Sequence, residues 1–140
     1  MNYIVYTDGS CKPTNPGYCG CGIVISDEEK QVIHCDSIYL GEGTNNIAEL
    51  TAIKIALEWL KENSDTWDNH IIYTDSNYAV GLLNKNWKAS KNQELVAELR
   101  RLLEEFPNTE VKWVKGHNNN EFNERADELA NAAVDSNKPN

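Results

Sequence analysis

The chain has 140 residues and a formal net charge of −9, and 40% of its residues are hydrophobic. This length fits one domain with a core of its own, and no apolar run approaches the roughly 20 residues of a membrane span. The acidic balance argues against a generic nucleic-acid binder but not against a site that holds its own divalent cations.

The first predicted element is a buried strand at residues 3–6, an aromatic and β-branched run. Asp8 and Gly9 follow, and the glycine either ends this strand or lets another segment approach the backbone closely. Residues 11–17 are rich in Pro, Asn and Gly and are predicted to form a loop. Because no basic segment precedes an apolar one at this end, we predict no signal peptide and a cytoplasmic location.

The rest of the chain pairs two strands in a hairpin and then alternates helices with strands. The predicted strands are residues 18–26, 31–40, 71–75 and 109–114. The predicted helices are residues 45–62, with Thr44 or Asn45 as the N-cap, and residues 76–84, 94–105 and 121–135. This β-β-β-α-β-α-α-β-α order predicts an α/β fold with a mixed sheet covered by helices.

The cysteines are Cys11, Cys19, Cys21 and Cys35. The spacing of Cys19 and Cys21 suits neither a zinc site nor a redox pair. We therefore expect buried free thiols, with a bridge from Cys19 or Cys21 to Cys35 as the alternative.

Four carboxylates lie where they could carry chemistry. Asp8 and Asp75 each follow a threonine at the end of an apolar strand, and Asp127 lies in the last predicted helix. Glu49 shares a helix face with Ala52, Ile53 and Ala56, where an ionised carboxylate is costly unless a cation, hydrogen bonds or water reach it. Taken singly, these residues also fit turn, cap or solvated positions, and His117 also fits an ordinary loop histidine.

Six segments, in this order, resemble type 1 ribonuclease H. They are YTDGSC (6–11), NPG (15–17), TNNIAEL (44–50), YTDSNYAV (73–80), VKWVKGH (111–117) and NERADELA (123–130). The resemblance spans residues 3–133 and implies a single ribonuclease H domain over residues 1–135, with a frayed tail at 136–140. It also implies a ribonuclease H-like α/β fold: a five-stranded mixed sheet, an antiparallel meander of three strands plus two parallel strands, with helices on both faces.

The resemblance implies an endonuclease that hydrolyses the RNA strand of RNA–DNA hybrids with two Mg²⁺ ions, Mn²⁺ substituting, and leaves 5′-phosphate and 3′-hydroxyl ends. Asp8, Glu49, Asp75 and Asp127 match the metal ligands of the family. His117 matches a loop histidine that assists proton transfer or product release. Carboxylate oxygens suit Mg²⁺, and two ions can activate a water and stabilise the leaving oxygen.

Substrate binding is assigned by the same resemblance. Asn15, Asn45 and Asn77 match residues that read 2′-hydroxyls, although a glutamine is more usual at the third position. Amides suit this task because they donate and accept, but turn formation and capping would also explain the first two. Thr44 matches a residue that holds a phosphate of the DNA strand.

Many bacterial members carry a long basic helix and loop that holds the hybrid. In its place this chain has only Trp87 with Lys85, Lys88 and Lys91, so we assign Trp87 and Lys88 to the substrate and expect weak affinity. A residue is also added ahead of the NPG loop, in 12–14, so the conformation of that loop is not predicted.

The partner implied is an RNA–DNA hybrid, with no membrane, and we expect a monomer. The alternatives are a catalytically silent hybrid-binding module and the nuclease core of a transposase, integrase or junction resolvase. The complete carboxylate set argues against the first, and the asparagines and the NERADELA segment argue against the second.

Overall fold

The computed structural model describes residues 1–116 and 120–139. The elements are β1 (Ile4–Lys12), β2 (Gly17–Ser26), β3 (Val32–Gly43), α1 (Asn45–Asn63), β4 (Ile71–Thr74), α2 (Asn77–Asn84), α3 (Gln93–Glu104), β5 (Glu110–Trp113) and α4 (Glu121–Asn137). Their order is the predicted one. Most boundaries lie within two residues of the prediction, and β1 and β3 are the exceptions.

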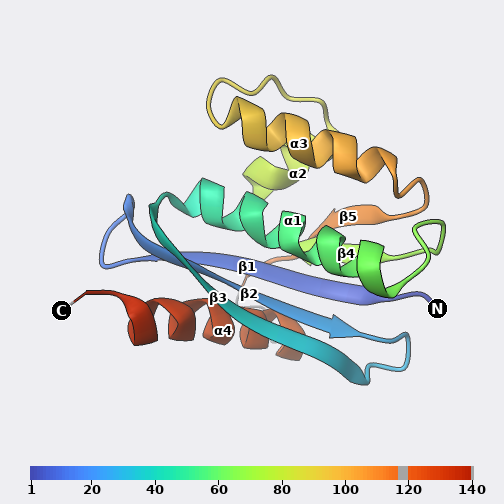
Figure 1. Cartoon of the computed structure of the whole chain (residues 1–140), viewed down its shortest axis with the longest axis horizontal. Coiled ribbons are helices and arrows are strands. Elements are labelled where there is room, and N and C mark those ends of the chain that lie inside the picture. Colours follow the sequence, from blue (N-terminus) through green and yellow to red (C-terminus); the bar gives the residue numbers. More distant parts are fainter. Residues whose placement is uncertain (117–119, 140) are drawn as a thin grey trace.

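The strands form one mixed sheet in the order β3-β2-β1-β4-β5. β1 pairs antiparallel with β2 and β2 with β3, whereas β4 runs parallel to both β1 and β5. Helices α1, α2 and α3 lie on one face of the sheet and α4 lies alone on the other (Figure 1). The predicted fold, a three-stranded meander with two parallel strands and helices on both faces, is confirmed.

The main core lies between the sheet and the three helices on its first face. Its fully buried members include Val5, Ile23, Ile25, Leu50, Ile53, Leu57, Ile72 and Leu99. In the strands these residues occupy every second position, and in the helices they lie three or four positions apart. Both spacings place side chains on one face of the element. Since β1 contacts α1 on one face and α4 on the other, it is the central element of the molecule.

The prediction that Gly9 might end the first strand is wrong, because β1 continues to Lys12. β2 lies beside residues 8–12 and pairs with them, with Asp8 opposite Gly22. The second interpretation of Gly9 is confirmed, since a Cβ there would lie 2.6–2.8 Å from Glu49 N and from atoms of Ala48. Gly9 therefore lets α1 pack directly on β1.

The prediction that all four cysteines are free thiols is wrong, and so is the alternative of a bridge to Cys35. The extension of β1 explains both errors. Cys11 lies in β1 opposite Cys19 of β2, with Cα atoms 4.1 Å apart, and the two form a disulfide. Cys21 and Cys35 are free, and Cys21 is buried. Cys11 was expected in a loop, where it would have had no strand partner.

β3 is the other element that differs, since it runs to Gly43 and not to residue 40. Gly41 adopts φ +80°, a conformation that favours glycine, and the pairing with β2 shifts register beside it, between Cys19 and Gly20. The irregular residue lets the strand continue where the sequence suggested an end.

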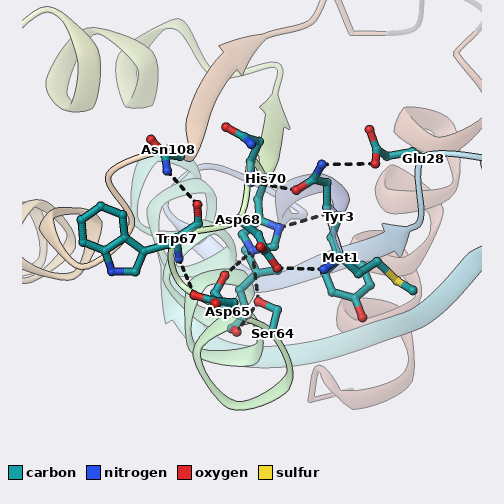
Figure 2. A network of polar contacts seen from close by, with 12 residues as sticks. Met1, Tyr3, Glu28, Ser64, Asp65, Trp67, Asp68, His70 and Asn108 are labelled. Carbon is teal, nitrogen blue, oxygen red and sulfur yellow. Dashed lines mark hydrogen bonds and ion pairs between the residues drawn. The ribbon is translucent and has the colours of Figure 1, made fainter.

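A polar network ties the start of β1 to the loop before β4 (Figure 2). The Nδ1 atom of His70 accepts a hydrogen bond from the Tyr3 N–H at 3.0 Å, and Nε2 lies 3.0 Å from the Asp65 carbonyl. With Nδ1 accepting, the ring is neutral, and burial lowers the pKa of His70. The Met1 ammonium donates to Asp68 at 2.9 Å beside it.

Among the described residues, no helix is long and apolar enough to cross a membrane. Residues 85–92, all of them described, join α2 to α3 without a helix. This connection therefore contains no long basic helix, as the sequence indicated.

Candidate active site

The parallel pairing of β1 with β4 sets the position of two carboxylates. The last residues paired are Thr7 and Thr74, and the next residues along the two strands are Asp8 and Asp75. Parallel strands reach the same edge of a sheet together, so both carboxylates lie at the carboxyl end of this pair. The repeated Thr-Asp sequence predicted this arrangement.

Two helices bring further carboxylates to the same place. Glu49 of α1 offers an oxygen within 4.8 Å of oxygens on Asp8 and Asp75. Asp127 of α4 lines the same pocket of about 410 Å³ and shares a hydrogen bond with Asp8. The structure thus gathers all four predicted carboxylates, from both faces of the sheet.

Both carboxylate oxygens of Glu49 are held by the protein. Oε1 accepts from the Gly9 N–H at 2.7 Å, and Oε2 accepts from the Thr74 hydroxyl at 3.3 Å. The Thr74 oxygen itself accepts from the Ser76 N–H at 3.1 Å, so its single proton is directed at Glu49. Glu49 is only 7% exposed, and these donors orient it and stabilise its charge.

Burial and mutual repulsion set the protonation of the cluster. Asp8 is 4% exposed, and its burial together with the charge of Glu49 raises its pKa to about 11. Burial and the charge of Asp75 raise the pKa of Glu49 to about 7. The cluster on its own therefore retains a proton at neutral pH, which a divalent cation would displace. An all-oxygen donor set of this charge fits Mg²⁺ or Mn²⁺.

The asparagines predicted to read 2′-hydroxyls lie at this pocket or next to residues that line it. The Asn45 N–H donates to Asn15 Oδ1 at 2.9 Å, so the NPG loop docks on the start of α1. Thr44 is the N-cap of α1 and its hydroxyl accepts from the Ile47 N–H at 3.3 Å, so the capping role falls to Thr44 and not to Asn45. Asn45 lines the pocket, and Asn77 is exposed at the first position of α2.

Trp87 and Lys88 do not line this pocket and lie on the connection between α2 and α3. Trp87 is 47% exposed and Lys88 is exposed. The Lys85 ammonium stands 5.9 Å from the centre of the Trp87 ring, within cation–π distance. His117 lies outside the described residues.

Two supporting residues were not identified from the sequence. Thr74 was interpreted only as a strand residue, although the repetition of Thr-Asp in the sequence could have drawn attention to the threonine as well as to the aspartate. Gly116 passes so close to Asp75 that a Cβ would lie 2.9 Å from its Oδ2. A side chain at Gly116 would therefore displace the carboxylate of Asp75. The only sign of this contact in the sequence was that a glycine, which has no Cβ, precedes His117.

Comparisons with known proteins agree with this geometry. A family model described as RNase H matches residues 1–135. The chain is 39% identical to a Ribonuclease H of Francisella philomiragia, covering 95% of this chain and 91% of that protein.

Two solved structures are also similar. A crystal structure of LC11-RNase H1 in complex with an RNA/DNA hybrid has a TM-score of 0.84 and 34% identity, covering 96% of this chain and 97% of that one. RNase H1 from Halobacterium salinarum has a TM-score of 0.85 and 27% identity, covering 98% of this chain and 100% of that one.

Proposed function

Because this chain belongs to the ribonuclease H family and is an enzyme of its type 1 class, we propose that it cleaves the RNA strand of RNA–DNA hybrids at internal positions. The reaction would use two Mg²⁺ ions and leave 5′-phosphate and 3′-hydroxyl ends. The observation that carries the proposal is the convergence of Asp8, Glu49, Asp75 and Asp127 on one pocket. The similar LC11 enzyme in complex with a hybrid supports this choice of substrate.

The four carboxylates would hold the ions where the parallel pairing of β1 with β4 ends. Asp8 has the central place, with hydrogen bonds to both Glu49 and Asp127, which suits a ligand shared between ions. Two bound ions would supply an activated water and stabilise the leaving 3′ oxygen. The rigid mounting of Glu49 on Gly9 and Thr74 keeps it in place before substrate arrives.

The residues around the pocket would bind and orient the hybrid. Asn15, Asn45 and Asn77 would read 2′-hydroxyls, which distinguish RNA from DNA. The Thr44 hydroxyl accepts a bond from α1 and still has its own proton to donate to a phosphate of the DNA strand. We also propose that His117 moves a proton or aids product release, and that residues 1–135 form the single domain that does all this.

The test is cleavage of a labelled RNA–DNA hybrid beside duplex DNA, duplex RNA and single-stranded RNA. We expect internal cleavage of the hybrid RNA alone, requiring Mg²⁺ and stopped by a chelator, with 5′-phosphate ends by end-group analysis. Asp8→Asn should be inactive, and Glu104→Gln, which removes an exposed carboxylate in the last turn of α3, should be unaffected. Equal cleavage of the hybrid in chelator, or full activity of Asp8→Asn, would refute the proposal.

A further inference from the structure

The connection between α2 and α3 is short but firmly held. It contains Trp87 among three lysines, at residues 85, 88 and 91, in a chain of net charge −9. It occupies the position of the longer basic segment in many relatives. Gln93 donates to the Ala89 carbonyl and Asn92 donates to the Tyr78 hydroxyl, and the contacts on Trp87 itself come from Gly81 and Arg100.

Gly81 holds both the backbone and the ring of Trp87. The Trp87 N–H donates to the Gly81 carbonyl at 3.2 Å. A Cβ on Gly81 would lie 2.2–2.4 Å from three atoms of the indole ring, so the ring rests directly on the backbone of α2. Trp87 is nevertheless 47% exposed, so the ring is supported on one side and open on the other.

Arg100 of α3 completes the support from the opposite side. Its Nε and Nη2 donate to the Leu82 carbonyl at 3.1 and 2.8 Å, and Nη2 also donates to the Trp87 carbonyl at 2.7 Å. The Leu82 carbonyl belongs to the last turn of α2, where carbonyls lack helical partners. One guanidinium therefore joins α3, the end of α2 and the connection, which the ammonium of a lysine cannot do with the same geometry.

We infer that Arg100 is a positioning residue for substrate binding, acting through Trp87. It keeps the open side of the ring turned outward, so that the indole is already ordered when it meets the sugar–phosphate backbone of the hybrid, beside the lysines. Lysines pair with phosphates, the apolar face of an indole can pack against the sugars, and a side chain ordered in advance loses less entropy on binding. This inference rests on the proposed function for its choice of ligand.

Arg100→Met should raise KM for the hybrid by about 3- to 10-fold and leave kcat within about twofold, the scale set by ordering one large side chain on binding. Arg101→Met is the matched control, since it removes the same charge from the neighbouring, exposed position of α3. Arg100→Lys should behave like Arg100→Met, because it keeps the charge and loses the planar fork. It also serves as the test variant if Arg100→Met does not fold.

A double-mutant cycle separates positioning from general stability. In a Trp87→Ala background, Arg100→Met should cause no further rise in KM, because the side chain on which it acts is gone. An equal rise in that background, an equal rise with Arg101→Met, or an unchanged KM in Arg100→Met would overturn the inference.

A second measurement needs no substrate. The fluorescence contributed by Trp87, taken as the difference from Trp87→Phe, should become more accessible to acrylamide in Arg100→Met and stay unchanged in Arg101→Met. Unchanged quenching in Arg100→Met would refute the positioning role even in an active enzyme. If the enzyme proved inactive on hybrids, increased quenching would still support the role of Arg100 while the proposed function failed.

Discussion

Replacing Asp8 by asparagine should stabilise the protein in the absence of divalent ions while abolishing cleavage. In the unfolded chain this carboxyl has a pKa near 3.8, and in the folded protein burial and the charge of Glu49 raise its pKa to about 11. At pH 7 the unfolded chain is ionised there and the folded protein is not. Each pH unit between 3.8 and 7 lowers the free energy of unfolding by about 1.36 kcal/mol, which amounts to about 4 kcal/mol at pH 7.

The gain from Asp8→Asn should be somewhat smaller than this cost, because Asp8 shares hydrogen bonds with Glu49 and Asp127 that the amide alters. We expect about 2 to 4 kcal/mol in the free energy of unfolding, or a rise in Tm of about 6 to 12 °C. Between pH 4 and 7 the folded parent binds more protons than the unfolded chain, so the contribution of Asp8 to stability falls as pH rises. The advantage of the variant should therefore grow toward neutral pH and shrink toward pH 4.

Urea unfolding followed by circular dichroism, in chelator at pH 4.5 and at pH 7, measures this difference. Glu104→Gln is the control for a simple change of net charge, and it should shift stability little at either pH. Adding Mg²⁺ should stabilise the parent by mass action and leave Asp8→Asn nearly unchanged. A variant no more stable than the parent at pH 7 in chelator, or an advantage that is the same at both pH values, would refute the account of the cluster.

Three further predictions concern groups outside the four carboxylates. His117→Ala should slow turnover by on the order of 10²-fold without weakening Mg²⁺ binding in a thermal titration, the range of general acid–base catalysis; an unchanged rate would make it an ordinary loop residue. Replacing Lys85, Lys88 and Lys91 by alanine should raise KM and flatten the log–log salt dependence of hybrid binding by up to about 3 units, one per phosphate contact. An unchanged salt slope would show that another surface holds the hybrid. Because burial lowers the pKa of His70 in the folded state, the parent should lose stability relative to His70→Phe as pH falls below about 6.5, and a pH-independent difference would contradict the neutral ring.

Local sequence predicted the helices well because their signals are local. α1 begins where Thr44 can cap it and continues through strong helix formers with apolar residues three and four apart. The true end of β1 was not predictable in this way. Nothing within residues 8–12 shows that β2 lies beside them, and pairing with β2 is what continues the strand through Gly9. The Cys11–Cys19 disulfide was missed for the same reason.

In the candidate site, too, local sequence identified some residues, while the roles of others depend on contacts between elements. The carboxylates could be found because Asp8 and Asp75 each follow an apolar run that ends in threonine, and Glu49 lies on an otherwise apolar helix face. The hydrogen bond from Thr74 to Glu49 joins residues 25 positions apart, and a threonine in a strand is ordinary, so its role required the structure. The mounting of Trp87 on Gly81 and Arg100 is likewise a contact between elements that the local pattern does not contain.

The central position of β1 has a consequence for how the protein opens. β1 is hydrogen-bonded to a strand on each side and covered by a helix on each face, so its amide hydrogens should exchange only when the whole domain unfolds. α4, which carries Asp127, lies alone on one face of the sheet (Figure 1). We therefore expect α4 to detach at a lower free energy than β1. Ions shared between Asp8 and Asp127 would link this outer helix to the innermost strand. Mg²⁺ should then slow hydrogen exchange in α4 far more than in β1. The helix that detaches most easily would thus be the one that the bound ions stabilise most.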